Sequence, residues 1–170
     1  MDFYQVIRSR RSIRAYKPDP VESDKLDRIL EAGRLAPSAC NLQPWAFVLV
    51  SDSAIRKDFK KVYKQPWLYE APLILVICAD TKRAWKRWDG QEYWQVDCAI
   101  AMQNMISAAA AEGLGACWIA AFDESACVKL LNLPPGIRPV AITPIGYPAE
   151  TKAPVADRLP LEDILHRERW

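Results

Sequence analysis

The sequence lacks the residues on which many common enzyme classes depend. Its single histidine, His166, rules out a histidine metal cluster and argues against a Ser-His or Cys-His nucleophile pair. It has no P-loop, and Gly113-Leu114-Gly115 does not continue as a dinucleotide fingerprint, because GxGxxG needs a third glycine at Trp118. We expect no metal site, and any redox or transfer chemistry is left to a bound cofactor.

Cysteine pairs are missing as well. The five cysteines lie far apart and form no CxxC motif, so reduced and mostly buried thiols are expected. They are Cys40, Cys78, Cys98, Cys117 and Cys127.

The sequence also lacks a large charge excess and a long hydrophobic run. Lys and Arg number 23 against 21 Asp and Glu, a balance that argues against a nucleic-acid-binding module. The apolar runs 71–79 and 98–111 fall short of the ~18–20 residues of a membrane span, and the N-terminus has no signal-peptide pattern. We expect one globular domain over residues 1–170, in the cytoplasm, with neither a membrane nor a nucleic acid as partner.

Against this balance, four arginines crowd into the stretch RSRRSIRAY: Arg8, Arg10, Arg11 and Arg14. On a helix, Arg10 and Arg14 would share a face and repel each other by about 0.2–0.5 kcal/mol. Guanidinium groups bind phosphate through paired hydrogen bonds, so a phosphate-bearing ligand is one interpretation. The other is a solvated basic helix end, which the helix dipole would favour. The stretch alone leaves both open.

Helices and strands alternate along the chain, which predicts helices packed around a sheet. We expect helices over 2–8, 23–36, 53–63, 97–112 and 123–131, and strands over 46–50, 71–79, 116–120 and 138–146. The helix at 97–112 has no charge between its two terminal acids and is apolar almost all round. It must be central in the domain or buried against a second subunit, and Gln103, Asn104 and Ser107 then need internal partners.

Two segments outside these elements carry candidate binding groups. Residues 37–45 form a proline-bracketed loop with short polar side chains, where binding groups often lie. Residues 83–95 mix charges with Trp85, Trp88 and Trp94. This second segment is either a surface helix with snorkelling cations or an aromatic lid over a substrate.

Four segments in order resemble the nitroreductase family of FMN-dependent oxidoreductases, and the likeness covers nearly the whole chain. They are RRSIRAY at 10–16, APSACNLQPW at 36–45, AEGLGACWIAAF at 111–122 and PIGYPAE at 144–150. The resemblance implies an α+β fold with a central mixed sheet flanked by helices. It also implies a homodimer, with two FMN sites built at the interface from both chains and the helix at 97–112 as the central dimer helix.

The resemblance assigns cofactor-binding residues by matching position. The arginines of the segment Arg10, Arg11, Ser12 and Arg14 would hold the ribityl phosphate, with Arg14 reaching the flavin pyrimidine edge. The partner subunit would lay the loop against the isoalloxazine through Pro37, Ser38, Ala39 and Asn41, with Gln43 behind. The backbone amides of Ile119, Ala120 and Ala121 would face the flavin near N5, and Arg158 would grip the phosphate. Ala156 stands where the family commonly has a second basic residue.

The reaction implied is ping-pong: NAD(P)H gives a hydride to flavin N5 and leaves, and an aromatic acceptor takes the electrons. Nitroaromatics, quinones and flavins are the acceptors expected, and no catalytic side chain is needed because the flavin carries the chemistry. Reductive dehalogenation, flavin destruction and a flavin-binding protein without turnover are the alternatives.

Overall fold

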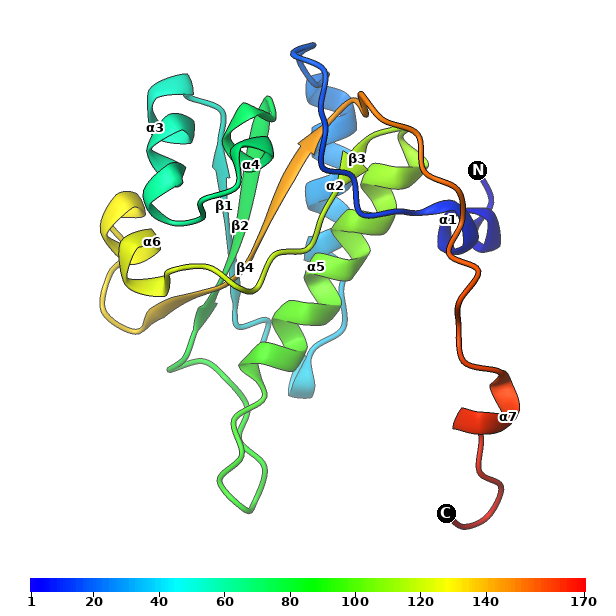
Figure 1. The fold of residues 1–170 in the computed structure, drawn as a ribbon. Coiled ribbons are helices and arrows are strands. Elements are labelled where there is room, and N and C mark those ends of the chain that lie inside the picture. The colour runs from blue at the N-terminus through cyan, green and yellow to red at the C-terminus, as the bar shows by residue number, and fades with distance from the viewer.

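The computed structural model describes residues 1–170 as one four-stranded antiparallel sheet with helices on both faces (Figure 1). The strand order is β1-β2-β4-β3. The strands are β1 (Trp45–Val50), β2 (Leu73–Asp80), β3 (Gly115–Ala116) and β4 (Ile137–Gly146). All strand pairs are antiparallel, so the sheet is not the mixed sheet that was expected. The one parallel pairing is an isolated bridge between Ser12 and Ala116 at the edge of the sheet.

The inner strand β2 explains how the helices divide into two layers. Every residue of β2 except Asp80 is buried, as expected for a continuous apolar strand covered on both faces. Leu75 and Ile77 belong to the core beneath α2 (Ser23–Arg34) and α5 (Trp94–Ala111). Their neighbours Ile74 and Val76 belong to a second core on the other face. That face is covered by α3 (Ser53–Asp58), a 3-10 turn at Phe59–Lys61, α4 (Pro66–Glu70) and α6 (Glu124–Leu131).

The two ends of the chain lie outside these layers. Helix α1 (Phe3–Ser9) sits beside the end of α5, and its Asp2 cap and Gln5 form a capping box. After residue 150 the chain runs away from the sheet as an exposed tail that holds the single turn α7 (Leu161–Ile164) (Figure 1). No helix of the protein is both long enough and apolar enough to cross a membrane.

Helix α5 matches the predicted apolar helix but starts earlier, at Trp94. Of the predicted internal partners, only that of Asn104 is present: its Nδ2 donates to the Ala32 carbonyl of α2 at 3.2 Å. Gln103 is exposed, and its Nε2 donates to Ser107 Oγ one turn on along the same helix at 3.1 Å. The helix is not covered on every side, because a stripe that includes Val96 (46% exposed) and Gln103 faces solvent in a single chain.

Three element predictions were inaccurate in their bounds. The strand expected over 116–120 comprises only Gly115–Ala116, because the Cys117 amide donates to the Thr143 side chain and pairing resumes only at the Ile119–Ile142 bridge. The helix expected over 53–63 is split into α3 and the 3-10 turn. Helix α2 ends at Arg34 rather than at residue 36, and α4 was not predicted.

Candidate functional site

The arginine stretch is extended rather than helical over most of its length. Helix α1 ends at Ser9, so Arg8 alone lies in a helix end and the basic-helix interpretation does not apply to the other three arginines. The Ile13 amide donates to the Ala116 carbonyl at 3.0 Å, and the Ala149 amide donates to the Ala15 carbonyl at 2.9 Å. Residues 10–16 therefore lie between β3 and the segment after β4; we call them the arginine segment.

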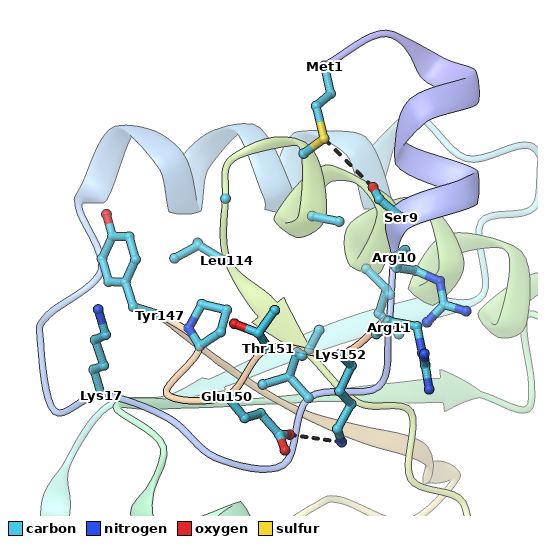
Figure 2. A pocket seen from close by; sticks show the side chains of 16 residues that line it. Met1, Ser9, Arg10, Arg11, Lys17, Leu114, Tyr147, Glu150, Thr151 and Lys152 are labelled. Carbon is cyan, nitrogen blue, oxygen red and sulfur yellow. Dashed lines mark hydrogen bonds and ion pairs between the residues drawn. The ribbon is translucent and has the colours of Figure 1, made fainter. Parts of the chain in front are cut away.

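The start of the arginine segment borders a cavity of about 450 Å³ (Figure 2). Arg10 and Arg11 line it together with two lysines, Lys17 and Lys152, and one acid, Glu150. Neither arginine side chain forms a hydrogen bond or an ion pair within the chain, whereas Glu150 already pairs with Lys152 at 2.9 Å. This cavity has an excess of uncompensated positive charge, which suits an anion such as a phosphate.

Glu150 and Lys152 clamp the arginine segment, and sequence reasoning gave neither of them a role. Glu150 accepts a hydrogen bond from the Arg14 amide at 2.6 Å, and Lys152 Nζ donates to the Ser12 carbonyl at 2.9 Å. The available signal was the pairing of an acid and a base in Glu150-Thr151-Lys152, which begins at the last residue of the PIGYPAE motif. The Arg14 amide, and then Lys152, hold the pKa of the Glu150 carboxyl below its usual range.

The clamp predicts how pH affects stability. A carboxyl whose pKa is lowered in the folded state stabilises the fold above its unfolded pKa of about 4.3, and this contribution disappears as pH falls through the lower folded pKa. Glu150→Gln should therefore melt below the wild type at pH 7, and the difference should shrink progressively as pH falls below about 4.3. Thermal unfolding of both proteins from pH 3 to 7 measures this; a difference that is constant across the range would contradict it.

The end of the arginine segment reaches a second, smaller cavity of about 120 Å³. The Arg14 guanidinium lies 5.7 Å from the ring centroid of Trp67, and Tyr63 packs edge-on against that ring at 5.5 Å. Residues 117–121 form the other wall of this cavity. Ala120 and Ala121 are exposed residues whose amides donate to no acceptor in the chain, so these amides are available to a ligand. The prediction for the Ile119 amide is wrong, because this amide donates to the Ile142 carbonyl at 2.9 Å in the bridge to β4. Sequence reasoning identified Arg14 and these alanines but missed Tyr63 and Trp67.

One chain does not bring all the predicted site residues together. Ala39, in the loop 37–43, contacts Asp97 in the first turn of α5, whereas the larger cavity is lined by Ala110 and Gly113 at the other end of that helix. An 18-residue helix is about 27 Å long, so the two sets of residues cannot meet in one subunit. Figure 1 shows the loop and the arginine segment beside opposite ends of α5. Arg158 is exposed in the tail and lines neither cavity.

The Nitroreductase family model matches residues 7–64 and 59–147, which together make up most of the chain. This protein belongs to the nitroreductase family. The match confirms the resemblance, the α+β fold class and the oxidoreductase class expected from it.

Individual relatives in the nitroreductase family cover almost the whole chain. An FMN reductase [NAD(P)H] from Bacillus subtilis is 34% identical and aligns with 98% of this chain and 74% of its own. A nitroreductase family protein from Clostridium difficile 630 superposes with a TM-score of 0.89 at 28% identity, over 100% of both chains. An FMN-dependent nitroreductase from Clostridium difficile R20291 superposes with a TM-score of 0.87 at 31% identity, over 99% of this chain and 100% of its own.

The three tryptophans proposed as a lid in this nitroreductase-family protein differ in their surroundings. Residues 82–93 form neither a helix nor a loose loop but a hairpin-like arm, closed by the Lys86–Glu92 bridge. Trp88 is 94% exposed near the tip of the arm, while Trp85 packs edge-on against Tyr93 at 5.1 Å. The assignment of Trp94 to the lid is wrong, because Trp94 is the first residue of α5 and its side chain is buried in the core between α5 and the sheet.

Proposed function

We propose that this nitroreductase-family protein is an FMN-dependent NAD(P)H oxidoreductase that acts as a homodimer and reduces a flat aromatic acceptor. The observation that carries the proposal is the arginine segment, which presents unpaired guanidinium groups to two cavities. At about 3.3 Å per residue, the Cα atoms of Arg10 and Arg14 are about 13 Å apart along an extended chain. The segment thus suits an elongated ligand with an anion at one end and a polar ring at the other.

The residues present fit FMN at both ends. Arg10 and Arg11 offer guanidinium groups for a phosphate at the larger cavity. Arg14 and the unpaired amides of Ala120 and Ala121 offer donors to the edge of a flavin at the smaller one. We assign Ser12, between the two ends, to the same site.

The homodimer is proposed because the remaining site residues lie elsewhere in a single chain. The loop with Pro37, Ser38, Ala39, Asn41 and Gln43 is too far from the arginine segment of its own subunit, and Arg158 lies in an extended tail. The uncovered stripe on α5, with Val96 exposed, offers an apolar contact surface for a second copy. A second subunit packed along α5 would supply the missing loop and tail.

When bound, FMN accepts a hydride from NAD(P)H and passes the electrons on to an acceptor. The chain contributes position and electrostatics: a fixed positive charge at Arg14 favours the more negative, reduced state of a flavin beside it. Ser38 is the one candidate for a catalytic side chain. Its Oγ already accepts a hydrogen bond from the Gln43 amide at 2.9 Å, which holds the loop in shape. We assign no catalytic side chain.

The absorption spectrum of the purified protein tests the proposal directly, followed by anaerobic titration with NADH and with NADPH. We expect flavin absorption bands that bleach with one equivalent of the preferred nicotinamide and return when a quinone or nitroaromatic is added. A protein that stays colourless after incubation with FMN would overturn the proposal. Bound flavin that neither nicotinamide can reduce would instead indicate a binding protein without turnover.

The exposed Trp88 provides a test of the acceptor site. If the arm covers a flat acceptor, Trp88→Ala should raise the acceptor KM several-fold, because base-to-aromatic stacking contacts are worth about 1–3 kcal/mol, and leave the FMN Kd unchanged. Steady-state kinetics and FMN titration measure the two effects. Trp94→Ala is the contrasting variant: its buried ring should cost about 3–5 kcal/mol of unfolding free energy. Equal effects of Trp88→Ala on acceptor and FMN, or none, would contradict the lid.

A further inference from the structure

Asp97 is the only buried charged residue of the protein, with 3% of its surface exposed. It lies in the first turn of α5, where the helix dipole favours a negative group and where no side chain caps the helix. No lysine or arginine forms an ion pair with it. A buried acid without a cation is costly, so its position calls for a specific role.

The carboxyl group makes one hydrogen bond, and that bond goes to the loop 37–43. Asp97 Oδ1 accepts the Ala39 amide at 3.0 Å, across 58 positions in the sequence. Asp97 Oδ2 is the one buried side-chain oxygen or nitrogen in the protein that has no partner. Buried polar atoms are nearly always paired, so the unpaired Oδ2 destabilises the fold. We take the hydrogen bond from Ala39 to Oδ1 to be the feature that offsets this cost.

The loop needs an anchor of this kind. Cys40, Asn41 and Gln43 all have positive φ angles, of 50°, 54° and 48°, a region that costs non-glycine residues energy. The other hydrogen bonds of residues 37–43 stay inside the loop, such as the Asn41 amide to the Ser38 carbonyl at 3.0 Å. The Asp97 bond is therefore the single hydrogen bond that ties the strained loop to the rest of the fold.

We infer that Asp97 is a positioning residue, which fixes the loop 37–43 on the first turn of α5 so that the loop can face a flavin. This inference rests on the proposed function for the loop's part in the flavin site. The anchor lies on the helix with the uncovered stripe, so the carboxyl sets the loop's position relative to a second subunit packed there.

Three variants of the full-length protein test this: Asp97→Ala, Asp97→Asn and a control, Asp52→Ala. Asp97→Ala removes the acceptor and should speed hydrogen exchange at the Ala39 amide at least tenfold, raise the FMN Kd about tenfold and change the visible circular dichroism of bound flavin. Asp97→Asn keeps an oxygen for Ala39 and should restore slow exchange, the flavin spectrum and an FMN Kd within about threefold of the wild type.

Asp52→Ala controls for the loss of any carboxyl that accepts backbone amides. Asp52 Oδ1 accepts the Ala54 and Ile55 amides at 2.9 Å at the start of α3, away from both cavities. This variant should lower Tm but leave Ala39 exchange and FMN binding unchanged.

Any one of three results would overturn the role of Asp97. The first is wild-type exchange at Ala39 in Asp97→Ala. The second is an Asp97→Asn variant as impaired as Asp97→Ala. The third is an Asp97→Ala variant with only a lower Tm and a normal flavin spectrum. Exchange at Ala39 is measured without FMN. A wild type that shows the protected amide but binds no FMN would therefore refute the proposed function and the flavin part of this inference, and leave the anchor itself confirmed.

Discussion

We expect Arg10→Ala to raise the FMN Kd at least tenfold. A charge-assisted hydrogen bond to phosphate contributes roughly 1.5–3 kcal/mol, and 1.4 kcal/mol corresponds to a factor of ten. Without ligand the same change should leave Tm unchanged, because the Arg10 side chain has no partner within the chain. Fluorescence titration of FMN against the apoprotein, together with thermal unfolding of the apoprotein, measures both.

Arg8→Ala is the matched control, two positions earlier. Arg8 lies in the last turn of α1, is exposed and does not line the cavity, so its removal should change the FMN Kd by less than about twofold. An unchanged FMN Kd in Arg10→Ala, or equal losses in both variants, would show that the phosphate is held elsewhere or only by general positive charge.

Gly115→Ala should disturb both the fold and the flavin site. A Cβ atom at Gly115 would lie 2.9 Å from the Cβ and Cγ2 atoms of Ile13, closer than such atoms approach. Since Ile13 Cβ is fixed to the backbone, the arginine segment itself must move. Overpacking of this kind typically costs about 1–3 kcal/mol, and at about 2–4 °C per kcal/mol for this chain length Tm should drop by roughly 2–12 °C. The FMN Kd should rise with it, because Ile13 lies between the ligand-facing arginines.

Gly33→Ala is the control for Gly115→Ala, because its Cβ atom would also be crowded but would not touch the arginine segment. A Cβ atom there would meet Met105 Cγ and Sδ at 2.7 Å and Phe47 Cζ at 3.0 Å, so these two side chains rather than a backbone segment must shift. Alanine is favoured over glycine inside a helix by about 1 kcal/mol, which offsets part of that crowding. Gly33→Ala should therefore lower Tm less than Gly115→Ala does and leave the FMN Kd unchanged. If Gly115→Ala were as mild, the close approach of the arginine segment to β3 would not matter for the site.

The fold was predictable from sequence where one local signal dominates. The apolar run of β2 and the uncharged run of α5 needed no tertiary information, and both elements were placed within about three residues. The prediction of a strand over 116–120 was wrong because it depends on a residue far away in the sequence: the Cys117 amide donates to the Thr143 side chain instead of to a strand carbonyl. The prediction for Trp94 was wrong for a similar reason. Its sequence neighbours are polar, but the start of α5 turns its ring into the core.

The site was predictable in part, because motifs identify residues but not their neighbours across the chain. The arginine segment, the loop 37–43 and residues 119–121 were chosen by their likeness to a family. Their roles stay predictions, except that of the Ile119 amide, which already donates to the Ile142 carbonyl. Lys152 and Trp67 lie outside the motifs, and Glu150 closes the PIGYPAE motif with no role assigned to it. Their closeness to Ser12 and Arg14 arises only when the chain after β4 pairs with the arginine segment and α4 packs beside it.

The separation of the loop 37–43 from the arginine segment, at opposite ends of α5, has a thermodynamic consequence for the proposed dimer. If each flavin is held by both subunits, cofactor binding and subunit association are linked equilibria, and each strengthens the other by the same free energy. Dilution then lowers the apparent affinity for FMN, because separating the subunits takes apart both flavin sites at once. Excess FMN would hold the pair together at concentrations where the apoprotein dissociates.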